Sequence, residues 1–277
     1  MIKKLLILGA KGMLGHALAS VFADAQPILW DKDEADITDA AVLNSKIGLL
    51  QPELIINAAA YTDVDGCEDH DDLAYAVNAT AVKNIADAAK ACGAFVAHYS
   101  TDYVFPGTRK EGYVEKDKPD PINAYGRSKL DGERLLQESG VPFLLIRTQW
   151  LYGPYGKNFV DTIAQKAKEV PELKVVNDQF GSPTYTEDLA QHTRMLIANG
   201  SQGIHHATNE GVTSWHDFAK EIVRTVGLST PVRPMGSEQL QRKAKRPAFS
   251  ALRNTTDTHL RSWQEGVHAY LRAKRGS

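Results

Sequence analysis

The fold class predicted by this 277-residue sequence is α/β, with a doubly wound parallel sheet and a smaller α+β lobe. Three observations support this prediction. Short apolar runs alternate with helical patterns through the first 150 residues, a glycine-rich turn follows the first run, and polar residues gather where the runs end. Alternating strands and helices of this kind form a parallel sheet covered by helices on both faces.

The predicted strands are short apolar runs bounded by polar or turn-forming residues. They lie at residues 3–8, 27–30, 54–57, 95–99 and 143–147. Residues 74–91 are rich in alanine, carry apolar side chains at helical intervals and predict a helix. Because ligands of such sheets bind at the carboxyl ends of the strands, the polar residues there are the candidates for a site.

Three glycines, Gly9, Gly12 and Gly15, join the first strand to the first helix. Gly9 allows a tight turn, Gly12 lets the backbone approach a pyrophosphate, and Gly15 permits close packing of helix on strand. The N–H groups at the helix start then face the phosphates. The spacing differs from the simplest dinucleotide fingerprint, and an ordinary strand-to-helix turn is the alternative. Its place at the head of a strand–helix alternation favours a Rossmann-type dinucleotide-binding fold.

The second predicted strand ends at Asp31, where an acidic group meets the adenosine ribose hydroxyls in such folds. This position favours NADH. Lys32 follows directly and offers a cation for a 2′-phosphate, so both NADPH and NADH remain open as cofactors. Asp36 and Thr38 are candidate N-caps for the next helix.

Composition narrows the class of protein. The chain is 43% hydrophobic and has a formal net charge of −2, which gives no indication of nucleic-acid binding. Cys67 and Cys92 are too few for a disulfide framework or a zinc site. No apolar run is long enough for a membrane span, and the first residues read as a strand rather than a signal peptide. We therefore expect a cytoplasmic protein with no membrane partner.

Tyr125 and Lys129 lie four residues apart in a predicted helix and therefore share a face. An ammonium beside the phenol favours its ionised form, whereas a free tyrosine has a pKa of about 10 and is poorly matched to acid–base chemistry near neutral pH. An exposed amphipathic face is the alternative explanation of this spacing. The glycine loop upstream favours a catalytic pair.

The second half of the chain is less regular. Turn-rich segments lie at 152–157 and 179–184, and helices are predicted at 158–168, 186–198 and 214–225, the last with Ser214 as its cap. We expect residues 1–150 to form the dinucleotide-binding domain. Residues 151–277 are expected to form mainly a substrate-binding lobe, with some helices returning to pack on the first domain.

Several motifs together resemble the extended short-chain dehydrogenase/reductase superfamily. They are the glycine loop, NAAA at 57–60, YSTDYVF at 99–105, the Tyr125 and Lys129 pair, and RTQW at 147–150. More narrowly, STDYVFPG, NDQFGSPT at 177–184, the Thr213–Trp215 stretch and the Arg246–Pro247 pair resemble the dTDP-4-dehydrorhamnose reductase family. The resemblance covers nearly the whole chain.

The resemblance implies reduction of the C4 keto group of dTDP-4-dehydro-β-L-rhamnose to give dTDP-L-rhamnose, with NADPH or NADH as the cofactor. Tyr125 is then the proton donor, Thr101 donates a hydrogen bond to the same oxygen, and Lys129 lowers the pKa of Tyr125 and binds the nicotinamide ribose. Ser100 is the alternative to Thr101 as the residue that donates this hydrogen bond. Because side chains alternate along a strand, only one of the two reaches the substrate.

The resemblance also implies two sets of binding residues. For the cofactor they are Gly9, Gly12, Met13, Leu14, Gly15, Asp31, Asp36, Ile37, Ala58, Ala59, Ala60, Tyr125 and Lys129. For the dTDP-sugar they are Thr62, Val64, Asp102, Tyr103, Trp150 and Arg246. Asp65 is either part of this site or a simple loop charge. Scattered carboxylates such as Glu187 show no ligand spacing, so we expect no catalytic metal.

Two other kinds of function fit the same scaffold. One is a non-catalytic dinucleotide-binding regulatory subunit, against which the set of Thr101, Tyr125 and Lys129 argues. The other is a nucleotide-sugar epimerase or dehydratase that keeps its nicotinamide bound; Asp102 follows the threonine here, but no glutamate follows the aspartate. A homodimer is a candidate assembly.

Overall fold

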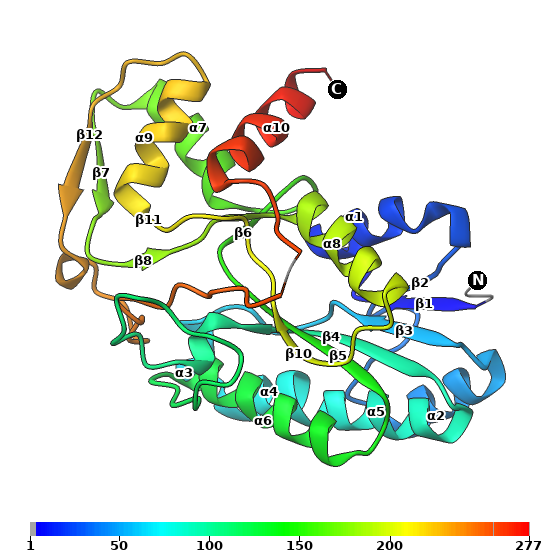
Figure 1. Ribbon diagram of the computed structural model, residues 1–277. Helices are drawn as coiled ribbons and strands as arrows, with labels where there is room; N and C mark the ends of the chain where they lie inside the picture. Colours follow the sequence, from blue (N-terminus) through cyan, green and yellow to red (C-terminus); the bar gives the residue numbers. More distant parts are fainter. Residues whose placement is uncertain (1–3, 257, 277) are drawn as a thin grey trace.

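A six-stranded parallel sheet forms the centre of the computed structural model, which describes residues 4–256 and 258–276 (Figure 1). The strand order is β10-β5-β4-β3-β1-β2. Their bounds are β1 Leu5–Leu8, β2 Ile28–Trp30, β3 Leu54–Asn57, β4 Phe95–Thr101, β5 Phe143–Thr148 and β10 Gly203–His206. The prediction of an α/β fold with a doubly wound parallel sheet is confirmed.

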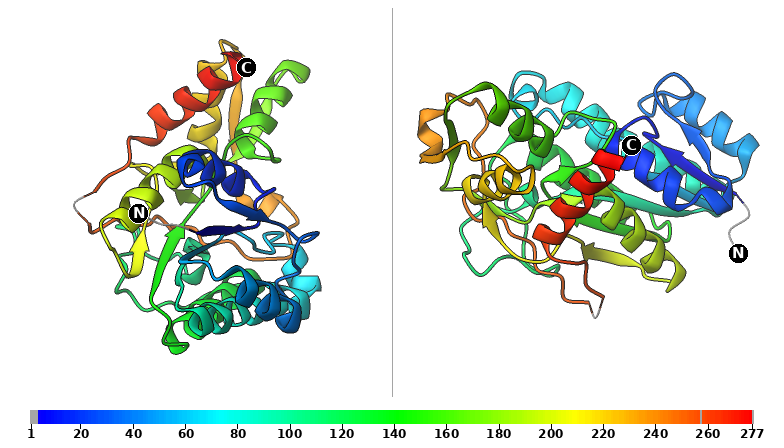
Figure 2. Two further views of the ribbon diagram at one scale, coloured as in Figure 1. Left: turned by 90° about the vertical axis from the view of Figure 1, so that its right-hand side faces the viewer. Right: turned by 90° about the horizontal axis from the view of Figure 1, so that it is seen from above.

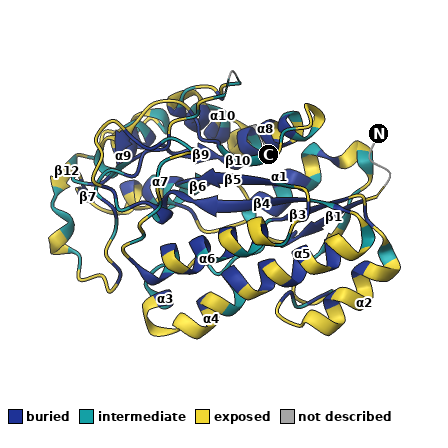
Figure 3. Ribbon diagram, turned by 60° about the horizontal axis from the view of Figure 1, so that its bottom comes forward, coloured by how far each residue is buried: buried dark blue, intermediate teal, exposed yellow. Residues whose placement is uncertain are grey.

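Alternating side chains of the strands enter two apolar cores, one on each face of the sheet. Ile7, Ile56 and Ile146 pack beneath α1 (Met13–Val21) and α8 (Thr186–Ala198). The opposite face packs against three helices, namely α2 (Ala40–Leu50), α5 (Ala81–Cys92) and α6 (Ala124–Glu138). Figure 3 shows the buried strands between helices whose outer faces are exposed.

The five predicted strands form, with small differences at their ends. Lys3 lies outside the described residues, and β4 and β5 run further than predicted, to Thr101 and Thr148. Strand β10 was not predicted; it pairs with β5 at one edge of the sheet. Because α8 and β10 join the first domain from beyond residue 150, the division at that residue stays a prediction.

The single helix predicted at 74–91 is wrong in detail, because two helices and a π-helical segment occupy residues 71–92. Helix α4 (Asp71–Tyr75) leads into the π segment Ala76–Thr80, and α5 follows. In the π segment, the buried Asn78 side chain accepts from Tyr61 N and donates to Tyr61 O, both at 2.9 Å. This local widening of the helix holds the loop after β3.

Two capping predictions had different outcomes. Ser214 caps α9 (Trp215–Thr225) by accepting from Asp217 N, as predicted. The N-cap of α2 is Asp39, whose side chain accepts from Val42 N, so the expectation of Asp36 or Thr38 was wrong. Asp36 instead accepts from the backbone and hydroxyl of Thr38 and closes a turn before the helix.

A smaller lobe lies at one end of the sheet (Figures 1 and 2). Its aromatic core lies among α7 (Phe159–Glu169), α9 and α10 (Trp263–Gly276). Three short strand pairs complete it, namely β7 (Leu173–Val176) with β12 (Val232–Met235), β8 (Phe180–Gly181) with β11 (Thr213–Ser214), and β6 (Leu151–Tyr152) with β9 (Thr184–Tyr185).

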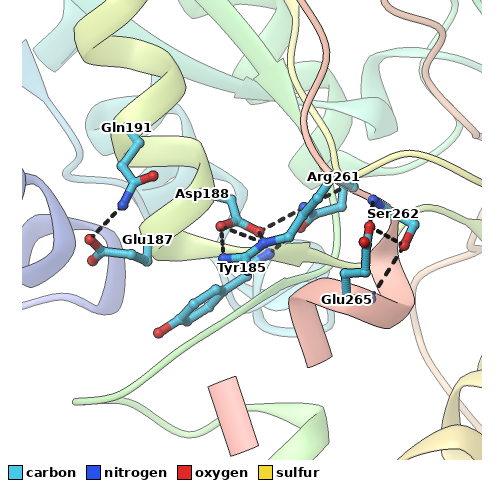
Figure 4. Close-up of polar contacts among 8 residues, drawn as sticks. Tyr185, Glu187, Asp188, Gln191, Arg261, Ser262 and Glu265 are labelled. Atoms are coloured by element: carbon cyan, nitrogen blue, oxygen red, sulfur yellow. Dashed lines mark hydrogen bonds and ion pairs between the residues drawn. The ribbon is translucent and has the colours of Figure 1, made fainter. Parts of the chain in front are cut away.

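Helix α10 is anchored to α8 by a buried polar network (Figure 4). Asp188 on α8 accepts two hydrogen bonds from Arg261 Nε, at 3.0 and 2.9 Å, and a third from Arg261 Nη2. Asn209 donates to Asp188 at 2.8 Å and accepts from Tyr185 N. The network joins the segment before α10 to a helix that packs on the sheet.

Residues 244–253 cross the carboxyl ends of the strands, and we call this segment the strap. Asn123 donates to Lys245 O at 2.8 Å, Phe249 N donates to Gly107 O at 2.9 Å, and Arg253 N donates to Tyr113 O at 2.7 Å. The strap therefore carries Arg246 and Ser250 from the end of the chain to the edge of the sheet where the candidate residues lie.

Candidate active site

A cleft of about 500 Å³ lies between the glycine loop and the ends of β2 and β3. Eight of the residues predicted to bind the cofactor line it, namely Gly9, Gly12, Asp31, Asp36, Ile37, Ala58, Ala59 and Ala60. Residues from three separate chain segments thus meet at the carboxyl edge of the sheet, as the predicted topology requires.

The backbone of the glycine loop requires glycine at two positions. Gly9 has φ +74°, and a Cβ there would lie 2.6 Å from Ala59 N. A Cβ on Gly15 would lie 2.1 Å from Gly9 O, so this glycine allows α1 to pack against the loop. Because the N-cap of α1 is Gly12, the N–H groups of its first turn remain for a ligand. These features fit the pyrophosphate of a dinucleotide.

Three residues of the predicted cofactor set lie inside α1 rather than on the cleft. Leu14 and Gly15 are buried, and Leu14 packs in the core beneath α1. The Met13 side chain packs against Gly156 of the lobe. Contact of Met13, Leu14 and Gly15 with a cofactor stays a prediction, and the backbone N–H groups at the start of α1 are the atoms placed to make it.

Asp31 lies at the end of β2 with both carboxylate oxygens hydrogen bonded to the backbone. Lys11 N and Lys32 N each donate to it at 2.9 Å. The Lys11 ammonium pairs with Asp33 at 2.5 Å. Each carboxylate oxygen of Asp31 retains a lone pair for a ribose hydroxyl, while two lysines stand nearby for a phosphate.

Tyr125 and Lys129 lie in the first turns of α6, whose N-cap Asn123 accepts from Gly126 N at 2.7 Å. The buried Lys129 ammonium donates to Tyr99 O at 2.6 Å, and burial lowers the pKa of Lys129 to about 8. Burial also raises the pKa of Tyr125 above its usual value. The predicted effect of Lys129 on the pKa of Tyr125 stays a prediction.

Thr101 ends β4, and its side chain acts on Tyr125 by lowering the pKa that burial raises. Its hydroxyl donates to Asp102 at 3.0 Å and accepts from Tyr103 N at 3.2 Å. Ser100 is buried and in register with Arg147, whereas Thr101 is in register with Thr148. Since alternate side chains point to opposite faces, Thr101 and not Ser100 faces Tyr125.

The Asp102 side chain is bound by residues of β4 and the strap, and its predicted contact with the substrate stays a prediction. The residue is only 2% exposed. One carboxylate oxygen accepts from Thr101 and the other accepts from the Ser250 hydroxyl of the strap. Ser250 was missed because no local motif marks it; the two partners are 148 residues apart in the chain.

Tyr103 lies beside Tyr125, and Arg246 lies close enough to Tyr103 to interact with its side chain. The Tyr103 ring meets the Tyr125 ring edge-on, with centroids 5.7 Å apart. Arg246 binds both oxygens of Asp65, at 2.8 and 2.6 Å, and this interaction lowers the pKa of Asp65 to about 2. Asp65 is therefore a partner of Arg246 rather than a simple loop charge. Arg242 is a second cation whose charge acts on Tyr103.

The remaining predicted substrate residues lie on two other segments. Trp150 has φ +50° and stacks on Trp215 with a centroid separation of 3.6 Å. Trp215 was not predicted as a site residue, although the Thr213–Trp215 stretch was recognised as a motif. Thr62 is exposed and Val64 half-buried in the loop after β3. Tyr103 and Arg246 lie near Tyr125, whereas Trp150 is held by the aromatic core of the lobe.

In residues 4–256 and 258–276, no group of three or more His, Cys, Asp or Glu side chains is arranged to hold a metal ion. Within the same ranges, every helix is too short or too polar to cross a membrane.

Comparison with known proteins gives the family. The family described as RmlD substrate binding domain matches residues 3–275. The spore coat polysaccharide biosynthesis protein SpsK of Bacillus subtilis is 38% identical, over 98% of each chain. A dTDP-4-dehydrorhamnose reductase of Burkholderia thailandensis is 39% identical, over 91% of this chain and 90% of that protein.

A solved structure agrees with these relatives. The crystal structure of dTDP-4-dehydrorhamnose reductase from Bacillus anthracis str. Ames in complex with NADP has a TM-score of 0.96 and 38% identity, covering 99% of this chain and 100% of that one. The glycine loop, the Tyr125 and Lys129 pair and the strap thus occur in a chain whose whole length resembles these proteins. This chain belongs to the RmlD substrate binding domain family.

Proposed function

We propose that the protein reduces the C4 keto group of dTDP-4-dehydro-β-L-rhamnose to give dTDP-L-rhamnose, using NADPH or NADH. The observation that carries the proposal is the meeting of Thr101, Tyr125 and Lys129 at the end of β4, beside a cleft that fits a dinucleotide. The relatives named dTDP-4-dehydrorhamnose reductase support the choice of substrate.

The cleft residues would hold the cofactor. The first turn of α1 would bind the pyrophosphate, Asp31 and its lysine neighbours the adenosine ribose, and Lys129 the ribose of the nicotinamide. When bound, the reduced nicotinamide supplies a hydride. Because Lys129 keeps a positive charge at neutral pH, it would hold that ribose while stabilising negative charge that develops nearby.

Tyr125 would deliver the proton to the keto oxygen. The phenol is protonated at neutral pH, which is the form that a proton donor needs, and the hydrogen bond with Thr101 opposes the rise in its pKa that burial causes. Thr101 lies beside the phenol and would donate a second hydrogen bond to the same oxygen. Two donors aimed at one oxygen stabilise the charge that develops there as hydride arrives.

The sugar nucleotide would lie across the entrance formed by the lobe and the strap. Tyr103 and Trp150 offer aromatic surfaces to a deoxysugar, with Thr62 and Val64 on the loop after β3. Arg246 offers a guanidinium fork to the diphosphate. Its pairing with Asp65 holds the fork in place; the Arg246 side chain is 10% exposed and that of Asp65 38% exposed.

The test is a spectrophotometric assay of the purified protein with dTDP-4-dehydrorhamnose and either NADPH or NADH. We expect stoichiometric, substrate-dependent oxidation of free cofactor and formation of dTDP-rhamnose. Stoichiometric consumption separates a reductase from an epimerase or dehydratase that keeps its nicotinamide bound, and from a regulatory subunit. Absence of oxidation with both cofactors rejects the proposal.

We further propose that the protein works in the cytoplasm, where nicotinamide cofactors are maintained, and that it forms a homodimer. The homodimer is tested by sedimentation equilibrium of the purified chain. A single species at the monomer mass across micromolar concentrations rejects it and leaves the proposed reaction untouched.

A further inference from the structure

Asp102 connects the strap to the proposed catalytic threonine. Its carboxylate lies between the hydroxyls of Thr101 and Ser250, and all three residues are at most 6% exposed. The carboxylate is therefore removed from bulk water, and Thr101 lies between it and Tyr125. Burying a carboxylate costs free energy unless it is hydrogen bonded, and here the two hydroxyls bind one carboxylate oxygen each.

The hydrogen bonds of Thr101 depend on whether Asp102 is charged. A hydroxyl has one proton to donate and two lone pairs to accept with. Thr101 accepts from Tyr103 N and, when Asp102 is a carboxylate, donates its only proton to Asp102. In that state the hydroxyl has only a lone pair to offer to Tyr125 and to the cleft. A lone pair repels the negative charge that develops on a keto oxygen during reduction.

Protonation of Asp102 reverses the direction of this hydrogen bond. The oxygen that faces Thr101 then carries the proton and donates it, while the other oxygen still accepts from Ser250. Thr101 now accepts twice, from Asp102 and from Tyr103 N, and its own proton is free to point into the cleft. No heavy atom has to move for this change.

We propose that Asp102 is a positioning residue that sets the direction of the Thr101 hydroxyl, holding its proton when charged and releasing it toward the reacting oxygen when neutral. This inference rests on the proposed reductase function and extends it to a residue outside the cleft. Ser250 of the strap shifts the equilibrium between charged and neutral Asp102, because its hydroxyl stabilises the charged form.

The surroundings of Asp102 place its change of protonation within the physiological pH range. Burial raises the pKa of Asp102 to about 7. The titratable groups that face it are Tyr103 on the same turn and Tyr125 at the start of α6, and its charge raises the pKa of each. Arg242 and Arg246 of the neighbouring segment act on Tyr103. Asp102 is therefore neutral below about pH 7 and charged above it.

The first test is the pH dependence of kcat/KM for reduction. The wild-type rate is expected to fall as the pH rises through about 7, followed by a second fall near 8 where Lys129 loses its proton. Asp102→Asn places an amide N–H against Thr101 and a carbonyl against Ser250, which copies the neutral acid. The ratio of variant to wild-type kcat/KM should therefore be about tenfold larger at pH 8 than at pH 6.

Two further variants separate positioning from mere structural support. Ser250→Ala removes the hydrogen bond that favours the charged carboxylate, so it should move the first fall to higher pH. Asp131→Asn, the same substitution at an exposed α6 aspartate paired with Arg134, should keep the wild-type profile. An Asp102→Asn profile that coincides with that of the wild type overturns the inference.

A second measurement does not depend on the reaction. In protein labelled with ¹³C at the aspartate carboxyl carbons, one signal should titrate near pH 7 and be missing from Asp102→Asn. If Asp102 titrates near its ordinary value of about 4, the inference is wrong even when the enzyme is active. If the wild type instead fails to oxidise either cofactor, the proposed function fails, and the titration still decides the ionisation of Asp102.

Discussion

Arg246 acts on both Asp65 and Tyr103 through one guanidinium group. It binds Asp65 with two nitrogens, one of which also donates to Ala244 O at 2.7 Å, and its charge acts on Tyr103. The side chain is thus held in one orientation before a substrate arrives. A group held in advance loses little further freedom on binding.

Arg246→Ala should therefore weaken binding of the nucleotide sugar more than it slows the chemical step. We expect KM to rise at least about tenfold, corresponding to roughly 1.4 kcal/mol of binding free energy, with a smaller change in kcat. Steady-state kinetics at saturating cofactor measure both. Arg233→Ala, at an exposed arginine of β12, is the matched control; a larger fall in kcat than rise in KM contradicts the assignment.

Gly9 is limited by both its backbone angle and the space around it. Gly9→Ala places a Cβ 2.6 Å from Ala59 N at φ +74°. We expect a loss of roughly 1–3 kcal/mol in the free energy of unfolding and weaker cofactor binding. Urea unfolding and fluorescence titration with NADPH measure the two effects.

The control for Gly9 is Gly48→Ala, at a helical glycine of α2 with open space around it. Alanine is favoured over glycine in a helix, so this variant should be more stable by up to about 1 kcal/mol. Equal effects of the two substitutions would show that the loss of stability in Gly9→Ala does not come from the close approach of the glycine loop to the end of β3.

Helix α6 depends on its contact with the π segment. A Cβ on Gly132 would lie 2.1 Å from Asn78 O, and Asn78 also donates to Ser128 Oγ at 3.1 Å. The same helix carries Tyr125 and Lys129 in the turns that precede Gly132. The position of the proposed acid therefore depends on how closely α6 approaches the preceding helix.

Gly132→Ala should push α6 away from the π segment and affect both stability and rate. We expect a loss of roughly 1–3 kcal/mol in unfolding free energy, and a fall in kcat because Tyr125 shifts relative to Thr101. Urea unfolding and steady-state assays on the same preparation provide the test. Wild-type kcat in a destabilised variant would mean that the start of α6 is positioned independently of Gly132.

Elements that are defined by residues close together in the sequence could be predicted, whereas those that depend on contacts between distant residues could not. The glycine loop and the helix with Tyr125 and Lys129 could be predicted because short motifs define them. The π segment could not, since the alanine-rich run at 74–91 has a helical period whether or not Asn78 turns inward to hold Tyr61. The stacking of Trp150 on Trp215 likewise joins two segments that are distant in the sequence.

Across the molecule, the strands of the central sheet could be predicted from the sequence, whereas the contacts of the strap could not. Apolar runs with helices between them predicted five strands, because burial of both faces leaves a clear pattern. Strand β10 has half-buried residues at 203–205 and contains two histidines, so its sequence lacks the apolar run by which the other strands were predicted. The link from Asp102 to Ser250 depends on where the strap crosses the sheet, and this path is a property of the folded chain.

The attachment of α10 to the rest of the molecule depends on Arg261. Arg261→Ala removes the cation from Asp188, which is only 7% exposed, and leaves a buried charge with fewer partners. We expect a loss of about 1–3 kcal/mol and earlier proteolytic cleavage near α10. Limited proteolysis with mass spectrometry is the measurement, and Arg272→Ala on the exposed side of α10 should leave the cleavage pattern as in the wild type.

Strand β10 has a consequence for synthesis of the protein. The chain leaves the sheet after β5, builds β6 to α8, and only then supplies the strand that covers the open side of β5. On the ribosome, β5 therefore exposes unpaired N–H and C=O groups until residues 203–206 emerge. An uncovered apolar strand edge can pair with another nascent chain. Truncation before residue 203 is thus expected to yield aggregates rather than a working dinucleotide-binding domain.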